Sequence, residues 1–241
     1  MTARIDRVWP DPAEHITDDE LTLAARSSRP ALRVNFVTSI DGAATRDGRS
    51  GGLGDAADRR LFELLRRACD VVLVGAGTVR TEGYGAMRVS DASVRWRVAH
   101  GLPEHPVFAV VTGHLGVDPA SPMFTDAPVP PVVFTSDRAT GVRELDGLAE
   151  VVRVGGTRVD IPAVVAALGE RGLTQVLCEG GPTLFGALIE ADALDELYLT
   201  VSPTLESGDA RRIATGPDGP RSMRLGRILR SGDTLLLRYD R

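Results

Sequence analysis

The chain has 241 residues, 43% of them hydrophobic, which is enough to bury the core of one large α/β domain or two small ones. Its formal net charge of −5 argues against nucleic-acid and membrane-surface partners. The two cysteines, Cys69 and Cys178, each lie in an apolar segment, which predicts buried free thiols in a reducing, cytoplasmic compartment. The four histidines lie far apart without ligand spacing, so no zinc site is expected.

Residues 1–30 are predicted to form an N-terminal arm that precedes a single domain over 31–241. Thr17 to Glu20 match a capping box that opens a short helix. The first 15 residues lack the apolar segment of a signal peptide, and no run reaches the roughly 18 apolar residues of a membrane span. Beyond the arm, strands alternate with helices, which favours one sheet with helices on its faces.

The first strand of the domain, 32–37, runs into a polar stretch that contains Ser39, Asp41 and Gly42. Asp-Gly is a turn signal, and a nearby hydroxyl can bond the local backbone. The stretch is therefore either a strand-ending turn or a polar rim at a strand end, where small ligands bind in open α/β sheets.

Asp58 lies in the first turn of the next helix, which Asp55 is placed to cap. It is either a carboxylate stabilised by the helix dipole, which contributes about 0.3–1 kcal/mol, or a pocket residue that grips the N–H groups of a heterocycle. Spacing alone favours the first interpretation. The glycine-rich stretch 49–54 before it is a surface loop or a cover for a ligand.

The run 70–74 predicts a buried parallel strand. It ends at Gly75 and Gly77, a G-x-G that lacks the third glycine of a dinucleotide fingerprint and does not by itself identify a dinucleotide site. Further strands are expected at 107–111 and 132–135.

A second junction of strand, glycines and helix follows the apolar run 175–178. The strand stops at Glu179, Gly180 and Gly181, and Pro182 suits the first turn of a helix because its missing N–H would be unpaired there. The open amides of a helix start carry partial positive charge, so the junction suits a phosphate or pyrophosphate. A plain connecting turn is the alternative, since a lone Gly-Gly is a weak signal.

Three motifs together resemble the pyrimidine reductase family, the reductase domain of bacterial riboflavin biosynthesis, over about 31–239. They stand in family order: Ser39-Ile40-Asp41-Gly42, then DVVLVGAGTV at 70–79, then EGGPTL at 179–184 with the later DEL at 195–197. Each motif is short, and their order and separation carry the resemblance.

The resemblance implies an α/β fold like that of dihydrofolate reductase: a mixed, mainly parallel sheet flanked by helices on both faces. It also implies NADPH as hydride donor and a homodimer. The cofactor-binding residues it implies are Gly75, Gly77, Thr78, Glu82, Thr135, Ser136, Arg138, Glu179, Gly180, Gly181, Pro182, Thr183 and Leu184.

Within this set, Thr78 and Glu82 fall where the family's Thr and Asp touch the cofactor, so Glu82 departs from the usual residue. Thr135 and Ser136 lie at a strand end that can meet the adenosine side in such folds. Arg138 is a candidate for the 2′-phosphate, because a planar guanidinium suits that group.

On the substrate side, Asp58 falls where dihydrofolate reductases place their pteridine-binding carboxylate. It is assigned the catalytic role, holding the pyrimidine or helping to deliver a proton. Asn35, Ser39 and Asp41 are assigned to substrate binding, and Asn35 stands where many bifunctional members have Lys. Those members carry a zinc deaminase domain, but this chain has no H-x-E with P-C-x-x-C, so only the reduction is expected.

The resemblance implies reduction of the ribosylamino side chain of 5-amino-6-ribosylaminouracil 5′-phosphate, or of the diaminopyrimidinone equivalent, to ribitylamino. Two alternatives stay open. One is a dihydrofolate- or pterin-type reductase on the same fold, and the other is a non-catalytic NADPH-binding regulatory protein.

Overall fold

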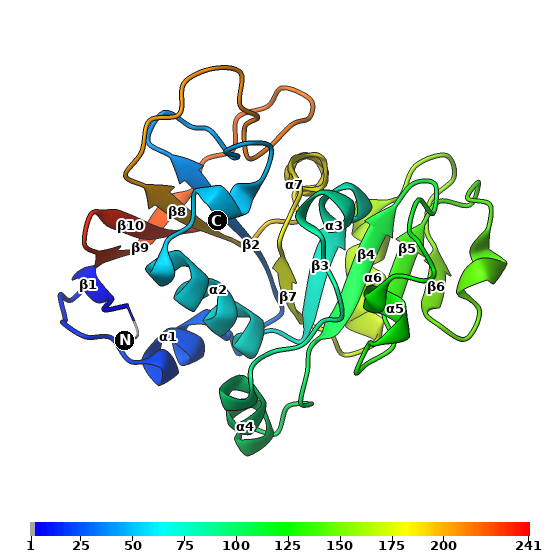
Figure 1. Cartoon of the computed structure of the whole chain (residues 1–241), viewed down its shortest axis with the longest axis horizontal. Coiled ribbons are helices and arrows are strands. Elements are labelled where there is room, and N and C mark those ends of the chain that lie inside the picture. Colours follow the sequence, from blue (N-terminus) through cyan, green and yellow to red (C-terminus); the bar gives the residue numbers. More distant parts are fainter. Residues whose placement is uncertain (1–2) are drawn as a thin grey trace.

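The computed structural model describes residues 3–241, in which ten strands form one sheet with helices on both faces (Figure 1). The strands are β1 (Asp6–Trp9), β2 (Ala31–Ser39), β3 (Val71–Gly75), β4 (Val107–Thr112), β5 (Val132–Thr135), β6 (Glu150–Arg153), β7 (Gln175–Cys178), β8 (Glu196–Ser202), β9 (Arg224–Ser231) and β10 (Thr234–Asp240). The helices are α1 (Asp18–Ala25), α2 (Ala56–Ala68), α3 (Ala76–Glu82), α4 (Asp91–Ala99), α5 (Pro122–Thr125), α6 (Ile161–Glu170) and α7 (Pro182–Glu190).

The strand order is β1-β9-β10-β8-β2-β7-β3-β4-β5-β6. All pairs from β8 through β2 to β6 are parallel, whereas β10 pairs antiparallel with both β8 and β9, and β1 with β9. The predicted mixed, mainly parallel sheet with helices on both faces is confirmed. No helix within residues 3–241 is both long enough and apolar enough to cross a lipid bilayer.

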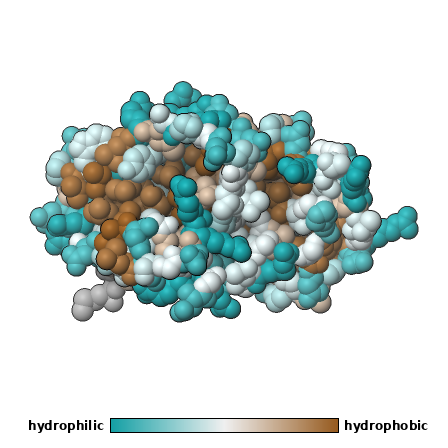
Figure 2. Space-filling model, turned by 90° about the horizontal axis from the view of Figure 1, so that it is seen from above, coloured by the Kyte–Doolittle hydropathy of each residue, from teal (hydrophilic) through white to brown (hydrophobic). Residues whose placement is uncertain are grey.

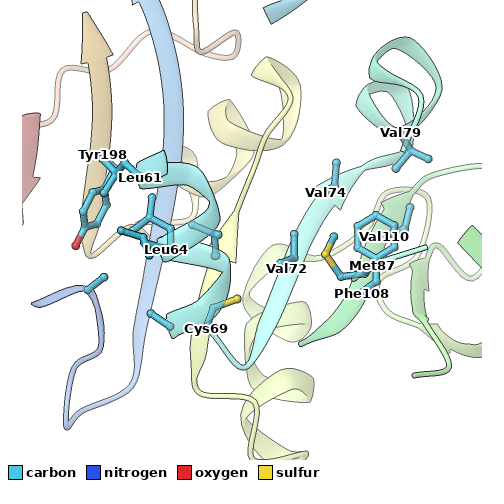
Figure 3. Packing of buried hydrophobic residues seen from close by; sticks show 14 of the residues in the cluster. Leu61, Leu64, Cys69, Val72, Val74, Val79, Met87, Phe108, Val110 and Tyr198 are labelled. Carbon is cyan, nitrogen blue, oxygen red and sulfur yellow. The ribbon is translucent and has the colours of Figure 1, made fainter. Parts of the chain in front are cut away.

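Two hydrophobic clusters fill the two faces of the sheet, and the alternation of β3 divides them. Val72 and Val74 point to the cluster that packs under α1 and α2, part of which is seen in Figure 3. Val71 and Leu73 point to the cluster formed with α6 and α7. Side chains alternate between faces along a strand, so a strand that is apolar throughout must be covered on both sides.

Helix α2 is fixed at both ends. Asp55 accepts hydrogen bonds from the amides of Ala57 and Asp58 at 2.8 and 2.9 Å, and its second oxygen accepts the hydroxyl of Thr234 at 2.7 Å. At the other end, fully buried Arg97 donates to the Cys69 carbonyl at 2.6 Å. These bonds satisfy helix-end groups that the helix itself leaves open, so α2 holds its side chains at defined positions.

The segment predicted as an arm takes part in the sheet and the core. β1 pairs with β9, α1 packs against α2, and Ile5 and Leu21 are 0% and 2% exposed. The predicted capping box is present, with Thr17 and Glu20 bonding each other's backbone amides. Residues 1 and 2 lie outside the described residues.

The connection from β8 to β9 crosses the start of α7. The Thr215 amide donates to the Pro182 carbonyl at 3.1 Å, and the Ala44 amide donates to the Arg211 carbonyl at 2.8 Å. Gly186 allows this approach, because a Cβ there would lie 1.9 Å from the Thr215 carbonyl oxygen.

Gly186→Ala is therefore expected to lower the free energy of unfolding by about 1–3 kcal/mol, as overpacking does. Gly169→Ala on α6 is the matched control, since a Cβ there meets nothing within 4 Å and alanine favours a helix. Chemical denaturation of both variants checks the expectation. Equal stability of the two would show that the connection does not press on α7.

Candidate functional site

A cavity of about 460 Å³ opens between α2, α3 and the carboxyl ends of β2 and β7. This volume lies in the range of small-molecule sites, and ligands of open α/β sheets bind at such strand ends. Its wall includes the aromatic rings of Phe36, Phe62 and Tyr84. The 3₁₀ turn η1 (Ser50–Gly52) also contributes, through Ser50 and Gly51.

A buried ion pair forms one wall of the cavity. Arg66 of α2 donates two hydrogen bonds to the carboxylate of Glu179, both at 2.6 Å, and the Tyr84 hydroxyl donates to the same carboxylate at 2.7 Å. The Glu179 side chain is 1% exposed, and the Arg66 guanidinium stacks on the Phe62 ring at 4.2 Å. A bidentate, fully hydrogen-bonded pair of this kind is rigid as well as charged.

The environment sets the protonation of the groups around this pair. Burial by itself lowers the pKa of Arg66, but the Glu179 charge and hydrogen bonds raise the pKa above its ordinary value. Burial and the nearby Glu179 raise the pKa of Tyr84 well above 10. Tyr84 is therefore a neutral donor to an ionised pair.

Asp58 lies one helical turn before Phe62 and lines the same cavity. Burial raises the pKa of its carboxyl above the ordinary 3.8, while the nearby Thr200 hydroxyl and Arg59 guanidinium act in the opposite direction. Gly54 permits this placement, because a Cβ there would lie 2.2 Å from the Asp58 Oδ2. The carboxyl can thus hold a proton at a pH where exposed carboxyls have lost theirs.

The two strand–glycine–helix junctions predicted from the sequence touch each other. The Gly75 amide donates to the Gly180 carbonyl at 2.7 Å. A Cβ on Gly180 would lie 2.7 Å from the Phe36 ring, and one on Gly181 would lie 2.3 Å from the Thr78 Oγ1, so neither position has room for a side chain. Gly181 begins α7 without a side-chain cap, which leaves amides of the first turn open to a ligand.

Of the residues assigned from the sequence, seven line the cavity: Asn35, Asp58, Thr78, Glu82, Glu179, Gly181 and Pro182. Gly75, Gly77, Gly180, Thr183 and Leu184 belong to the same two junctions but do not line it. Leu184 is 6% exposed and packs in the core with α6 and β5.

Ser39 and Asp41 form a strand-ending turn outside the cavity wall. The Ser39 hydroxyl donates to Asp41 at 2.5 Å and accepts the Ala43 amide at 2.9 Å. Asp41 also accepts the Ser207 amide at 2.7 Å, and these bonds lower its pKa to about 2. Ser39 and Asp41 thus form the strand-ending turn that was one of the two interpretations of the sequence. Substrate binding by these two residues stays a prediction.

Thr135, Ser136 and Arg138, assigned to the adenosine side and the 2′-phosphate, lie at the end of β5 or just after it, two strands away from β3. The Ser136 hydroxyl donates to the Gly113 carbonyl at 3.0 Å, which ties the ends of β4 and β5 together. Thr135 is fully buried, whereas Arg138 is exposed. None of the three lines the cavity.

Glu82 holds the glycine-rich loop. Its Oε1 accepts the Ser50 amide at 2.9 Å, which draws η1 onto the rim of the cavity. Glu82 also lines the cavity, so the residue that holds the loop is part of the cavity wall.

Arg66, Phe62 and Tyr84 line the cavity without having been predicted from the sequence. A signal existed for two of them, because positions 58, 62 and 66 repeat every four residues and share one face of a helix. Tyr84 lies in a loop after α3 and had no comparable signal.

Comparison with known proteins gives a family and several relatives. The model of the RibD C-terminal domain matches residues 30–237. The chain is 28% identical over 204 residues to the riboflavin biosynthesis protein RibD of Bacillus amyloliquefaciens, covering 83% of this chain and 52% of that protein, so it spans about half of that relative. It is 31% identical over 192 residues to the 2,5-diamino-6-ribosylamino-4(3H)-pyrimidinone 5′-phosphate reductase of Methanothermobacter thermautotrophicus, covering 78% and 85%.

Solved structures agree with these relatives. A pyrimidine reductase-like protein from Corynebacterium diphtheriae superposes with a TM-score of 0.85 at 25% identity, covering 93% of this chain and 98% of that one. RibD of Acinetobacter baumannii superposes with a TM-score of 0.70 at 17% identity, covering 88% and 58%, which shows the shared fold.

Asp58→Asn is expected to stabilise the protein increasingly as pH rises. The raised pKa means that the folded protein binds a proton that the unfolded chain has lost, so wild-type stability falls as pH rises from the ordinary carboxyl pKa through the raised one. The amide of the Asp58→Asn variant does not titrate in this pH range, so the variant does not lose stability in this way. Denaturation of both proteins between acidic and neutral pH measures the difference.

The matched control is Asp91→Asn, which removes a carboxylate and its interaction with the helix dipole from the first turn of α4, at a site outside the cavity. A stability gain in Asp58→Asn that does not change with pH would contradict the buried-carboxyl explanation.

Proposed function

This chain belongs to the RibD C-terminal domain family, and on that premise we propose that it reduces the ribosylamino side chain of a pyrimidine 5′-phosphate in riboflavin biosynthesis. The resemblance to pyrimidine reductases that the sequence motifs carried is thereby confirmed. The substrate we propose is 5-amino-6-ribosylaminouracil 5′-phosphate or the diaminopyrimidinone equivalent. The observation that supports it is the single cavity that is lined both by Asp58 of α2 and by Gly181 and Pro182 at the start of α7.

The family of reductases implies a nicotinamide cofactor, and we assign NADPH. The residues present suit it, because Gly181 lines the cavity and α7 starts there without a side-chain cap, which leaves amides of its first turn open to an anion. Gly181, Pro182 and Thr78 would hold the pyrophosphate end. When bound, the reduced nicotinamide supplies the hydride.

The protein's own residues orient the substrate and manage a proton. The reduction adds hydride to the sugar carbon of the ring-opened imine and a proton to the imine nitrogen. Asp58 is the cavity carboxyl whose raised pKa lets it hold the pyrimidine N–H groups or help to deliver that proton. Phe62 and Tyr84, fixed through Arg66 and Glu179, give a planar ring apolar walls.

The test is NADPH oxidation, followed by loss of its absorbance, with the pyrimidine phosphate and with dihydrofolate as the competing substrate. We expect turnover of the pyrimidine phosphate, and a decrease of about 10²–10⁴-fold in kcat for Asp58→Asn, as loss of a general acid produces. Asp91→Asn on α4 should retain the wild-type rate.

Consumption of dihydrofolate alone would replace the pyrimidine substrate by a pterin. NADPH binding without consumption of either substrate would indicate a regulatory protein. NADH oxidised as readily as NADPH would overturn the cofactor assignment.

We also propose a homodimer, formed through the open side of the β8–β10 part of the sheet. Leu199, Val201, Ile228, Leu235 and Leu237 share this side by their registers, and none of them packs in either core cluster of residues 3–241. We call these five residues the β8–β10 face. Figure 2 shows apolar surface gathered on this half of the molecule. Apolar faces that no element of the same chain covers are typical of obligate contacts between copies.

Leu235→Glu is expected to convert the dimer to a monomer, because it places a charge in the apolar contact. Leu235 is 37% exposed in the single chain, so the monomer itself tolerates the change. Leu23→Glu on α1, at a site 54% exposed, is the matched control. Light scattering of the eluting protein measures the mass, and a monomeric wild-type protein would contradict the proposal.

A further inference from the structure

A second, small cavity lies on the α1 and α2 side of the sheet and shares no lining residue with the larger one. Its volume is about 10 Å³, roughly the space that one water-sized atom needs. The polar side chains that line it are Tyr198, Arg227 and Arg238, and the other lining residues are leucines of α1, α2, β9 and β10. Because apolar walls screen charge poorly, the two cations act strongly on each other and on any ion that enters.

The two arginines stand directly opposite each other in the sheet. Arg238 of β10 is the register partner of Arg227 on β9 and of Tyr198 on β8, so the three side chains form one row on the same face. Like charges directly opposite each other on neighbouring strands destabilise a sheet. An arginine also stays charged inside a protein, so neither side chain can relieve the repulsion by losing a proton. The row therefore needs an opposite charge.

Carboxylates of the described chain compensate only part of this positive charge. Asp240 lies 2.9 Å from Arg238. Glu196 is the next carboxylate in the sheet, and it pairs with Arg33 at 3.0 Å. Within residues 3–241 no carboxylate lies within 4.0 Å of Arg227, and burial together with the neighbouring Arg238 lowers the pKa of its guanidinium. Arg227 is thus a half-buried cation without a counter-ion from this part of the chain.

The Tyr198 hydroxyl is a second, independent indication of a ligand. Tyr198 is 5% exposed, and its Oη is buried without a hydrogen-bond partner among residues 3–241. Burial and the charge of Glu196 raise the pKa of Tyr198 to about 12, so the hydroxyl stays protonated and can donate. A buried donor that lacks an acceptor is costly, so a group that accepts a hydrogen bond is favoured beside it.

We propose that the small cavity binds one monatomic anion, chloride, held by the guanidinium groups of Arg227 and Arg238 and by the hydroxyl of Tyr198. The ion places a negative charge between the two opposed cations and gives the tyrosine donor an acceptor. The cavity is too small for a polyatomic anion such as sulfate or phosphate. Since its lining comes from α1, α2 and three strands, the ion joins the N-terminal segment and helix α2 to the antiparallel part of the sheet.

The experiment is urea unfolding in which sodium chloride is exchanged for sodium gluconate at constant ionic strength, since gluconate is too large for the small cavity. A ligand that binds only the folded protein lowers the unfolding equilibrium constant. For one site, we expect the constant of wild type to fall about 10-fold for each 10-fold increase in chloride above the dissociation constant. Arg227→Met should lose this dependence. In gluconate it should unfold no more readily than wild type, because the like-charge contact is gone.

Two further variants separate the site from general effects of charge. Tyr198→Phe removes only the hydroxyl, so it should keep the chloride dependence with an affinity about 10-fold weaker. Arg95→Met, at an exposed arginine of α4 outside both cavities, is the matched control for net charge and should respond to chloride as wild type does. Equal stability of wild type in the two salts would overturn the proposal. So would a chloride dependence that Arg227→Met retains in full, because the ion would then act elsewhere.

Crystallography locates the ion in the wild-type protein and does not depend on the folding of any variant. Crystals grown with sodium bromide in place of the chloride should show one anomalous scatterer between Arg227, Arg238 and Tyr198. A water molecule at this position, without anomalous signal, would overturn the proposal.

Discussion

The buried pair between Arg66 and Glu179 is the interaction on which the site depends. It joins α2 to the end of β7, and the Tyr84 hydroxyl adds the segment after α3. Removing one partner of such a pair leaves an uncompensated buried charge, which costs about 3–5 kcal/mol. The pair therefore fixes the distance between the helix that carries Asp58 and the glycine junction at Gly180–Gly181, and with it the width of the cavity.

Helix α2 then acts as the frame of the site, because both of its ends are hydrogen-bonded to other parts of the chain. Asp55 and Thr234 secure the start, and Arg97 secures the end. The frame presents different chemistry along its length: a carboxyl with a raised pKa at Asp58 and a compensated cation at Arg66. Burial of Asp58 works against stability, as is common for groups that serve chemistry rather than folding.

The two halves of the cavity have distinct physical characters. The half at the start of α7 offers backbone amides that no side chain caps, which suits an anionic cofactor. The half at the start of α2 offers the Asp58 carboxyl with its raised pKa beside the Phe62 ring, which suits a heterocycle. Glu82, which stands where the family has Asp, accepts the Ser50 amide. Its carboxylate therefore joins the end of α3 to η1, at the rim of the cavity.

The sequence by itself determined the elements and the two glycine junctions, since helix caps, apolar runs and glycine turns are encoded within a few residues. The cap at Asp55 and the helix start at Pro182 are found as expected, and the strand predicted at 70–74 is found one residue later, at Val71–Gly75. Only the tertiary structure decided that Arg66 meets Glu179, 113 residues away, and that Tyr84 joins them across 95. It also decided that the turn at Ser39 and Asp41, one of the two interpretations that the sequence allowed, lies away from the cavity wall and is tied to Ser207, 166 residues from Asp41. Contacts of that separation depend on how strands are ordered in the sheet, and no local pattern of residues contains that information.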